Sequence, residues 1–163
     1  MRHIISVLLE NESGALSRVA GLFSARGYNI ESLTVAPTND ETLSRMTIVT
    51  VGDDRKIDQI EKHLNKLVDV AALQDITVRG HLEREIILVK FKIQASQKED
   101  LDLIVDAYKA SLSDVAENQY ILEMSGSSEK IDELMKSLPN VDIVEVVRSG
   151  VIGLAAGERA LTV

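Results

Sequence analysis

The residues best suited to chemistry lie in one short polar loop, "ENESG", at positions 10–14. An amphipathic helix is predicted directly after this loop, and the first N–H groups of a helix have no partner within it, so they can bind an anion. Gly14 has no side chain to keep a ligand away from that backbone, and the Asn11 amide offers both a donor and an acceptor. Such a loop can bind a small zwitterion, with its carboxylate on the N–H groups and its ammonium group on the amide oxygen.

Two further segments extend this candidate site. Leu16 lies in the first turn of the predicted helix and Ile30 follows its end, so both could flank a branched apolar side chain, and Asn29 stands next to Ile30. A plainer interpretation stays open. Asparagine before a helix is most often a cap, glycine there is most often a turn, and Asn29 with Ile30 could simply begin a strand.

Other kinds of chemistry find little support in the sequence. The chain has no cysteine, which excludes disulfides, thiolate nucleophiles and cysteine-ligated zinc. His3, His63 and His81 show no metal-ligand spacing, and no glycine-rich phosphate fingerprint follows a strand. Ser13, Ser17 and Ser24 have no nearby His–Asp constellation that could activate them. We therefore predict neither a catalytic residue nor a metal site in this chain.

The composition also restricts the partners. The net charge of the 163-residue chain is −8, which disfavours nucleic acid and anionic membranes because neither would gain from electrostatic attraction. The apolar run at residues 4–9 is too short for a signal-peptide core or a membrane span. These features predict a soluble cytoplasmic protein.

Hydrophobic periodicity predicts the same order of elements in both halves of the chain. In the first half, a strand at 4–9 precedes a helix with Leu16, Val19, Ala20 and Phe23 on one stripe, which Gly27 ends. Strands at 29–37 and 43–51, a helix capped near Asp53 and a strand at 70–78 follow.

The second half begins with the alternating strand "EIILVKFKI", and Ser96 with Glu99 resembles a capping box for the next helix. The order βαββαβ predicts an α+β protein made of two ferredoxin-like domains, each with both helices on one face of an antiparallel sheet. We place the domains at residues 1–79 and 80–163. The second strand of such a sheet usually lies at its edge, where a two-fold dimer that continues the sheet would protect it.

Long segments of the chain resemble a known family. In the first half these are "LLENESGALSRVAGLFSARGYNIESLTVAP", "LSRMTIVTVGD" and "QIEKHLNKLVDV"; in the second half the likeness is looser, in "EREIILVK", "GSSEKID" and "VVRSGVIGLAAGE". The family is the regulatory, or small, subunit of acetolactate synthase. One departure concerns the C-terminal tail, where the family usually has a basic residue and this chain has Ala156.

The resemblance implies that residues 1–79 form an ACT domain, an amino-acid sensor that makes side-by-side homodimers and binds L-valine at the interface. Asn11, Gly14, Ala15 and Leu16 of one chain would meet Asn29 and Ile30 of the other. It also implies a large catalytic subunit as partner, which carries thiamine diphosphate, magnesium and FAD, with no cofactor in this chain. The small subunit would activate that partner and make it sensitive to feedback inhibition by valine in branched-chain amino-acid biosynthesis.

Three alternatives remain at this point. A free-standing ACT-type sensor could act on a different partner. An RNA-binding module of the same fold would need exposed aromatic residues and a basic face, which two Phe, three Tyr and the acidic charge do not provide. An independent enzyme would need a nucleophile and a base that the sequence lacks.

Overall fold

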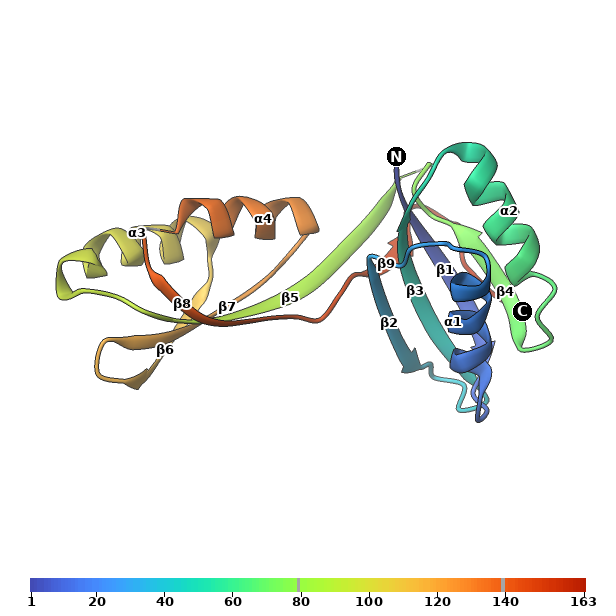
Figure 1. Ribbon diagram of the computed structural model, residues 1–163, viewed down its shortest axis with the longest axis horizontal. Coiled ribbons are helices and arrows are strands. Elements are labelled where there is room, and N and C mark those ends of the chain that lie inside the picture. Colours follow the sequence, from blue (N-terminus) through green and yellow to red (C-terminus); the bar gives the residue numbers. More distant parts are fainter. Residues whose placement is uncertain (79, 139) are drawn as a thin grey trace. The chain divides into compact units, whose positions relative to one another are not determined.

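A computed structural model of the protein describes residues 1–78, 80–138 and 140–163 (Figure 1). Contacts divide the chain into two compact units. The first comprises Met1–Leu82 together with Val151–Val163, and the second comprises Glu83–Gly150. The predicted division into residues 1–79 and 80–163 differs from these units mainly in the C-terminal segment, and its boundary residue Arg79 lies outside the described residues.

The first unit has the predicted βαββαβ order (Figure 1). Its elements are β1 (Arg2–Glu10), α1 (Ala15–Ala25), β2 (Ser32–Pro37), β3 (Leu43–Val51), α2 (Asp54–Leu64) and β4 (Val70–Asp75), with β9 (Ile152–Ala155) near the C-terminus. The strands form an antiparallel sheet in the order β2-β3-β1-β4, so β2 lies at an edge as predicted. One core lies where the two helices meet the sheet, around Ile5, Val7, Phe23, Ile48 and Ile60.

Local sequence explains how these elements begin and end. The Asp53 carboxylate accepts a hydrogen bond from the Lys56 N–H at 2.8 Å and caps α2, as predicted. Gly27 follows α1 with φ +65°, which confirms the predicted stop. Strand β2 begins at Ser32 rather than Asn29, and the carbonyl of Asn29 accepts a hydrogen bond from the Thr50 hydroxyl at 2.6 Å.

The second unit repeats the order in β5 (His81–Lys92), η1 (Ala95–Gln97), α3 (Lys98–Tyr108), β6 (Ser111–Ala116), β7 (Gln119–Gly126), α4 (Ser128–Ser137) and β8 (Asp142–Arg148). The sheet order is β6-β7-β5-β8, and the α+β prediction of two ferredoxin-like units is confirmed. The predicted capping box is wrong in position. Gln94 and Gln97 form it instead, because a short 3-10 turn with Ser96 inside it precedes α3.

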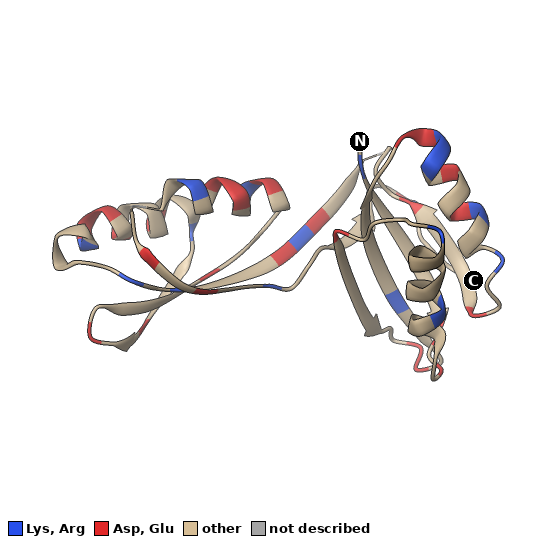
Figure 2. Ribbon diagram, in the orientation of Figure 1, with Lys and Arg blue, Asp and Glu red and all other residues tan. Residues whose placement is uncertain are grey.

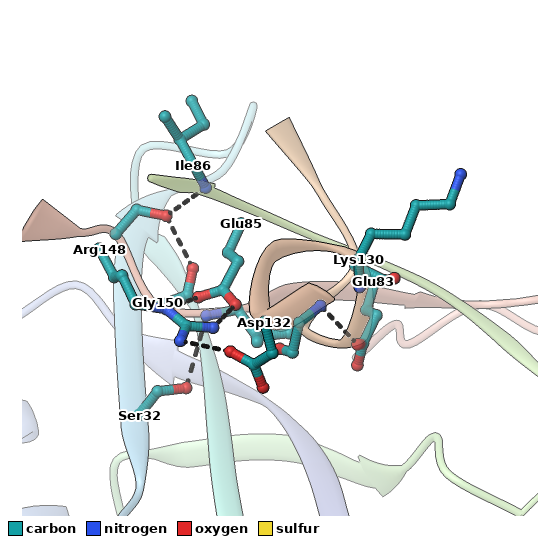
Figure 3. Close-up of polar contacts among 12 residues, drawn as sticks. Ser32, Glu83, Glu85, Ile86, Lys130, Asp132, Arg148 and Gly150 are labelled. Carbon is teal, nitrogen blue, oxygen red and sulfur yellow. Dashed lines mark hydrogen bonds and ion pairs between the residues drawn. The ribbon is translucent and has the colours of Figure 1, made fainter. Parts of the chain in front are cut away.

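An ionic cluster joins three elements of the second unit (Figure 3). Arg148 on β8 contacts the buried carboxylate of Glu85 on β5, and its Nη1 donates to Asp132 on α4 at 2.8 Å. These two carboxylates raise the pKa of the Arg148 guanidinium. Because Glu85 is almost fully enclosed, the cationic partner offsets the cost of burying its charge.

The C-terminal segment completes the first unit. Val151 packs with Ile4, Val49 and Ile76 in a small second core, and the Thr34 hydroxyl donates to the carbonyl of Val151 at 2.8 Å. Ile4 and Val49 are paired across β1 and β3 and point away from the face that carries Ile5 and Ile48. The segment therefore covers the sheet face opposite the helices. No helix in the described parts of the chain is long and apolar enough to cross a membrane.

Candidate functional site

The loop between β1 and α1 leaves the start of α1 open. Gly14 occupies the N-cap position with φ +91°, a left-handed conformation that favours glycine. Among the described residues, no side chain caps this helix, and its first turn contains no acidic residue. The first N–H groups of α1, at Leu16 and Ser17, are therefore not used by a cap and are available to an anion. The interpretation of Asn11 as a simple helix cap is thus wrong.

Asn11 instead fixes the loop to the turn before β3. Its N–H donates to the carbonyl of Thr42 at 2.7 Å and its Nδ2 donates to the carbonyl of Glu41 at 2.9 Å. Its Oδ1 accepts from the Ser44 hydroxyl at 3.1 Å. An amide oxygen has two lone pairs and an amide nitrogen two hydrogens, so Asn11 keeps one acceptor and one donor position for a ligand while its orientation is fixed.

The turn that holds Asn11 is itself ordered by an acidic side chain. The Asp40 carboxylate accepts from the Thr42 N–H at 2.9 Å and from the Thr42 hydroxyl at 2.6 Å. These hydrogen bonds lower the pKa of the Asp40 carboxyl below its usual range. The carbonyls of Glu41 and Thr42 are thereby held in the direction of Asn11.

On its other side the loop lies against an ion pair. Arg18 on α1 donates from Nε and Nη2 to the two carboxylate oxygens of Asp69, both at 2.5 Å. Asp69 is 5% exposed and immediately precedes β4. The Arg18 guanidinium holds the pKa of the Asp69 carboxyl below its usual range. A Cβ on Gly14 would come within 2.9 Å of Arg18 Nη1, so the missing side chain at position 14 makes room for this guanidinium.

The ion pair predicts an acid sensitivity. Because the folded-state pKa of Asp69 is lowered, its stabilising contribution is complete above the unfolded pKa of about 3.9 and is lost as pH falls through the lower folded value. We expect Asp69→Asn to flatten the decline in unfolding free energy between about pH 5 and pH 2, as measured by urea denaturation at each pH. The matched control is Asp58→Asn, since Asp58 pairs with Lys62 on the exposed side of α2 and should leave the profile nearly unchanged. An unchanged profile for Asp69→Asn would contradict the assignment.

The two remaining loop residues have different environments. Ala15 is 3% exposed and belongs to the core, so it can offer a ligand only its backbone. Leu16 is 43% exposed, and Ala20 is exposed one turn later. The predicted apolar stripe is therefore half correct, since Val19 and Phe23 are buried and the other two leave an apolar strip on the surface of α1.

Asn29 and Ile30 lie after the other end of α1, away from the loop. Asn29 is exposed, and Ile30 is half-buried against the first core. A helix of 11 residues separates the two segments by about 16 Å at 1.5 Å per residue. One chain therefore brings Asn11, Gly14, Ala15 and Leu16 together but does not bring Asn29 and Ile30 to them.

Sequence reasoning missed three residues that shape the loop, namely Arg18, Ser44 and Asp69. Arg18 reads as an ordinary polar residue on a helix, and Ser44 as an alternating position of a strand. Asp69 stands between two valines in "LVDVAA", and a single acidic residue at the start of a strand has no specific meaning in a sequence.

The fold agrees with comparisons to known proteins. Residues 5–72 match the family described as "AHAS small subunit-like ACT domain", and residues 84–157 match "Small subunit of acetolactate synthase". The two matches and the two ferredoxin-like units define a two-domain regulatory protein with an N-terminal ACT domain.

Full-length relatives give the particular family. The chain is 53% identical to the "Acetolactate synthase isozyme 3 small subunit" of Salmonella typhimurium and 52% identical to that of Escherichia coli, with 99% of each chain covered in both comparisons. A crystal structure of the acetolactate synthase small subunit from Thermotoga maritima is 32% identical, with a TM-score of 0.88 over 98% of this chain and 99% of that one. The chain belongs to the acetolactate synthase small-subunit family. It is a regulatory, non-catalytic subunit of an enzyme of branched-chain amino-acid biosynthesis, as its sequence predicts.

Proposed function

We propose that this small subunit binds L-valine at an interface between two ACT domains and transmits valine feedback inhibition to its catalytic subunit. The observation that carries the proposal is the uncapped start of α1, beside an asparagine whose orientation is fixed by three hydrogen bonds. The helix N-terminus suits the carboxylate of valine. The free acceptor position of Asn11 suits the ammonium group, and the exposed Leu16 suits the apolar side chain.

The edge strand β2 explains how a second copy would complete this site. It carries no charged residue (Figure 2), whereas exposed edges of monomeric proteins are commonly protected by charges. If β2 pairs with β2 of a second copy, the two strands run antiparallel about a two-fold axis. The segment before one β2, with Asn29 and Ile30, then lies beside the end of the partner strand, where the partner's loop 11–16 is found.

The expected affinity is that of a metabolite sensor. Burying a valine side chain contributes about 1.5–3 kcal/mol, and a helix terminus contributes about 0.3–1 kcal/mol for a carboxylate. With the ammonium contact added, we expect a Kd in the micromolar-to-millimolar range, or about −4 to −8 kcal/mol. A coupling of about 1–3 kcal/mol between the two functional states would give about 5- to 150-fold regulation.

The catalytic partner in this proposal is the large subunit of acetolactate synthase in the cytoplasm. It would carry thiamine diphosphate, magnesium and FAD and perform the condensation, while the small subunit raises its activity. The proposal assigns this chain a binding role alone.

The test is calorimetric titration of the full-length chain with L-valine, with D-valine and L-alanine as controls, alone and with the catalytic subunit. We expect saturable binding of L-valine near one per chain and inhibition of the reconstituted enzyme over the same concentration range. If the chain stimulates the catalytic subunit but valine neither binds nor inhibits, the effector assignment is overturned. If the chain binds valine but does not stimulate the catalytic subunit, it is instead a sensor that acts on another partner.

A further inference from the structure

We propose that Arg18 and Asp69 form a positioning pair that sets the geometry of the β1–α1 loop for the ligand, rather than a cation that captures the ligand carboxylate. This inference rests on the proposed function, since it concerns how the same site is held in shape. It assigns a role in valine affinity to two residues that sequence reasoning leaves as ordinary surface and strand-end positions.

The geometry of the Arg18–Asp69 pair restricts the movement of both side chains. Arg18 makes two parallel contacts to the carboxylate of Asp69 at 2.5 Å, a fork arrangement that fixes the orientation of both groups. Asp69 is 5% exposed, so its side chain has little freedom to leave. The pKa of its carboxyl is lowered chiefly by the hydrogen bond from Arg18, and the pKa of Arg18 is raised chiefly by the same bond.

Asp69 also holds the other end of the loop through its backbone. Its carbonyl accepts from the Glu10 N–H at 2.8 Å, at the last residue of β1. Arg18 in turn lies one turn into α1, where its N–H donates to the carbonyl of Gly14 at 2.9 Å. A single residue before β4 is thus connected to the positions where the loop begins and ends, 10 and 14.

The guanidinium of Arg18 also lies close to the proposed ligand position. Arg18 Nη1 would lie 2.9 Å from a Cβ on Gly14, so the guanidinium lies beside the N-cap residue that directly precedes the turn with the free N–H groups of Leu16 and Ser17. Small movements of Arg18 would therefore move those donors. A second consequence concerns charge, because the guanidinium is already neutralised by Asp69 and has only Nη1 left without a contact to that carboxylate. The N–H groups at the start of α1 remain the anion-binding element.

The experiment compares L-valine affinity in four full-length variants by calorimetry, with thermal unfolding measured in parallel. The variants are Arg18→Met, Asp69→Asn, the double variant and Arg18→Lys. Each single change of the pair to a neutral residue is expected to raise the Kd about tenfold, within the range of directly coupled contacts, and the double variant is expected to be no weaker than either single variant. Arg18→Lys keeps the charge but loses the planar fork, so it should fall between wild type and Arg18→Met.

The control is Lys62→Met, which removes the exposed pair with Asp58 on α2 and should keep wild-type affinity. If Asp69→Asn binds valine as tightly as wild type or more tightly while Arg18→Met loses binding, Arg18 captures the carboxylate and the positioning role is overturned. If the variants unfold at lower temperature but keep wild-type Kd, the pair is merely structural and the proposal fails. Absence of binding by the wild-type protein, alone and with its catalytic subunit, would instead overturn the valine site itself.

Discussion

Gly14→Asp is expected to raise the valine concentration for half-maximal inhibition more than about 100-fold, because a like charge placed against a ligand carboxylate costs several kcal/mol and each 1.4 kcal/mol is tenfold. The new carboxylate would stand at the open start of α1, where the ligand carboxylate is expected to bind. Its Cβ would also meet Arg18 Nη1 at 2.9 Å. The measurement is inhibition of the reconstituted enzyme by L-valine.

Two further substitutions separate charge from backbone strain. Gly14→Ala keeps the strain at φ +91° but adds no charge, so it should weaken the valine response less than Gly14→Asp. Gly157→Asp adds the same side chain at φ +74° with no neighbouring atom within 4 Å, and it should keep the wild-type response. Left-handed strain costs about 1–2 kcal/mol, which is small beside a typical folding free energy of about 5–15 kcal/mol. A Gly14→Asp protein that is still inhibited by valine would remove the helix start from the site.

The repeated fold was predictable because each helix and strand has its own hydrophobic period in the local sequence. Alternation in β5 buries Ile87, Val89 and Phe91 and leaves their neighbours outside, and the helical period of α2 buries Ile57, Ile60 and Leu64. Both periods follow from backbone geometry alone. The boundaries were less predictable. Before the start of β2, the carbonyl of Asn29 accepts from the side chain of Thr50, a residue on another strand, and a single sequence pattern does not reveal such a contact.

The candidate site was predictable only in part, for a related reason. The glycine at the start of a helix and the preceding asparagine are neighbours in sequence, so their combination can be read directly. Arg18 and Asp69 are 51 residues apart, and Asn11 and Ser44 are 33 apart. Nothing local distinguishes such residues until the sheet order brings β1, β3 and β4 side by side. The C-terminal segment is similar, because its packing on the first unit depends on which sheet face is left open.

The backbone of β2 gives a sharp test of the proposed dimer. The carbonyl of Thr42, the residue just before β3, faces β1, because it accepts from the Asn11 N–H. The carbonyl of Leu43, the first residue of β3, accepts from the Thr38 N–H at 2.9 Å and faces the β2 side. The direction of the backbone hydrogen bonds alternates along an antiparallel strand, so Arg45 and Thr47 face β2 as Leu43 does. These two residues are paired with Ala36 and Thr34. The N–H groups of Leu33 and Val35 must therefore point outward from the sheet edge.

Val35→Pro is accordingly expected to abolish the dimer and, with it, valine binding. Proline removes a donor that a second β2 would need but that β3 does not use, and proline is tolerated at such edge positions. Val35 is 41% exposed, so little core packing is lost within the chain. Sedimentation analysis should show a monomer, and calorimetry should show a valine Kd at least about tenfold weaker, since two of the six proposed site residues, Asn29 and Ile30, come from the second copy.

Val35→Ala is the matched control, because it shortens the same side chain and keeps the N–H group. It should remain dimeric and bind valine close to wild-type affinity. A dimeric Val35→Pro protein with full affinity would show that the copies do not meet along β2, and the two asparagines would then have to be brought together in another way. A monomeric protein that still binds valine tightly would show that one chain suffices, and Asn29 and Ile30 would leave the site. Only the loss of both properties in the proline variant, with both kept in the alanine variant, is explained by a ligand held between two uncharged strand edges.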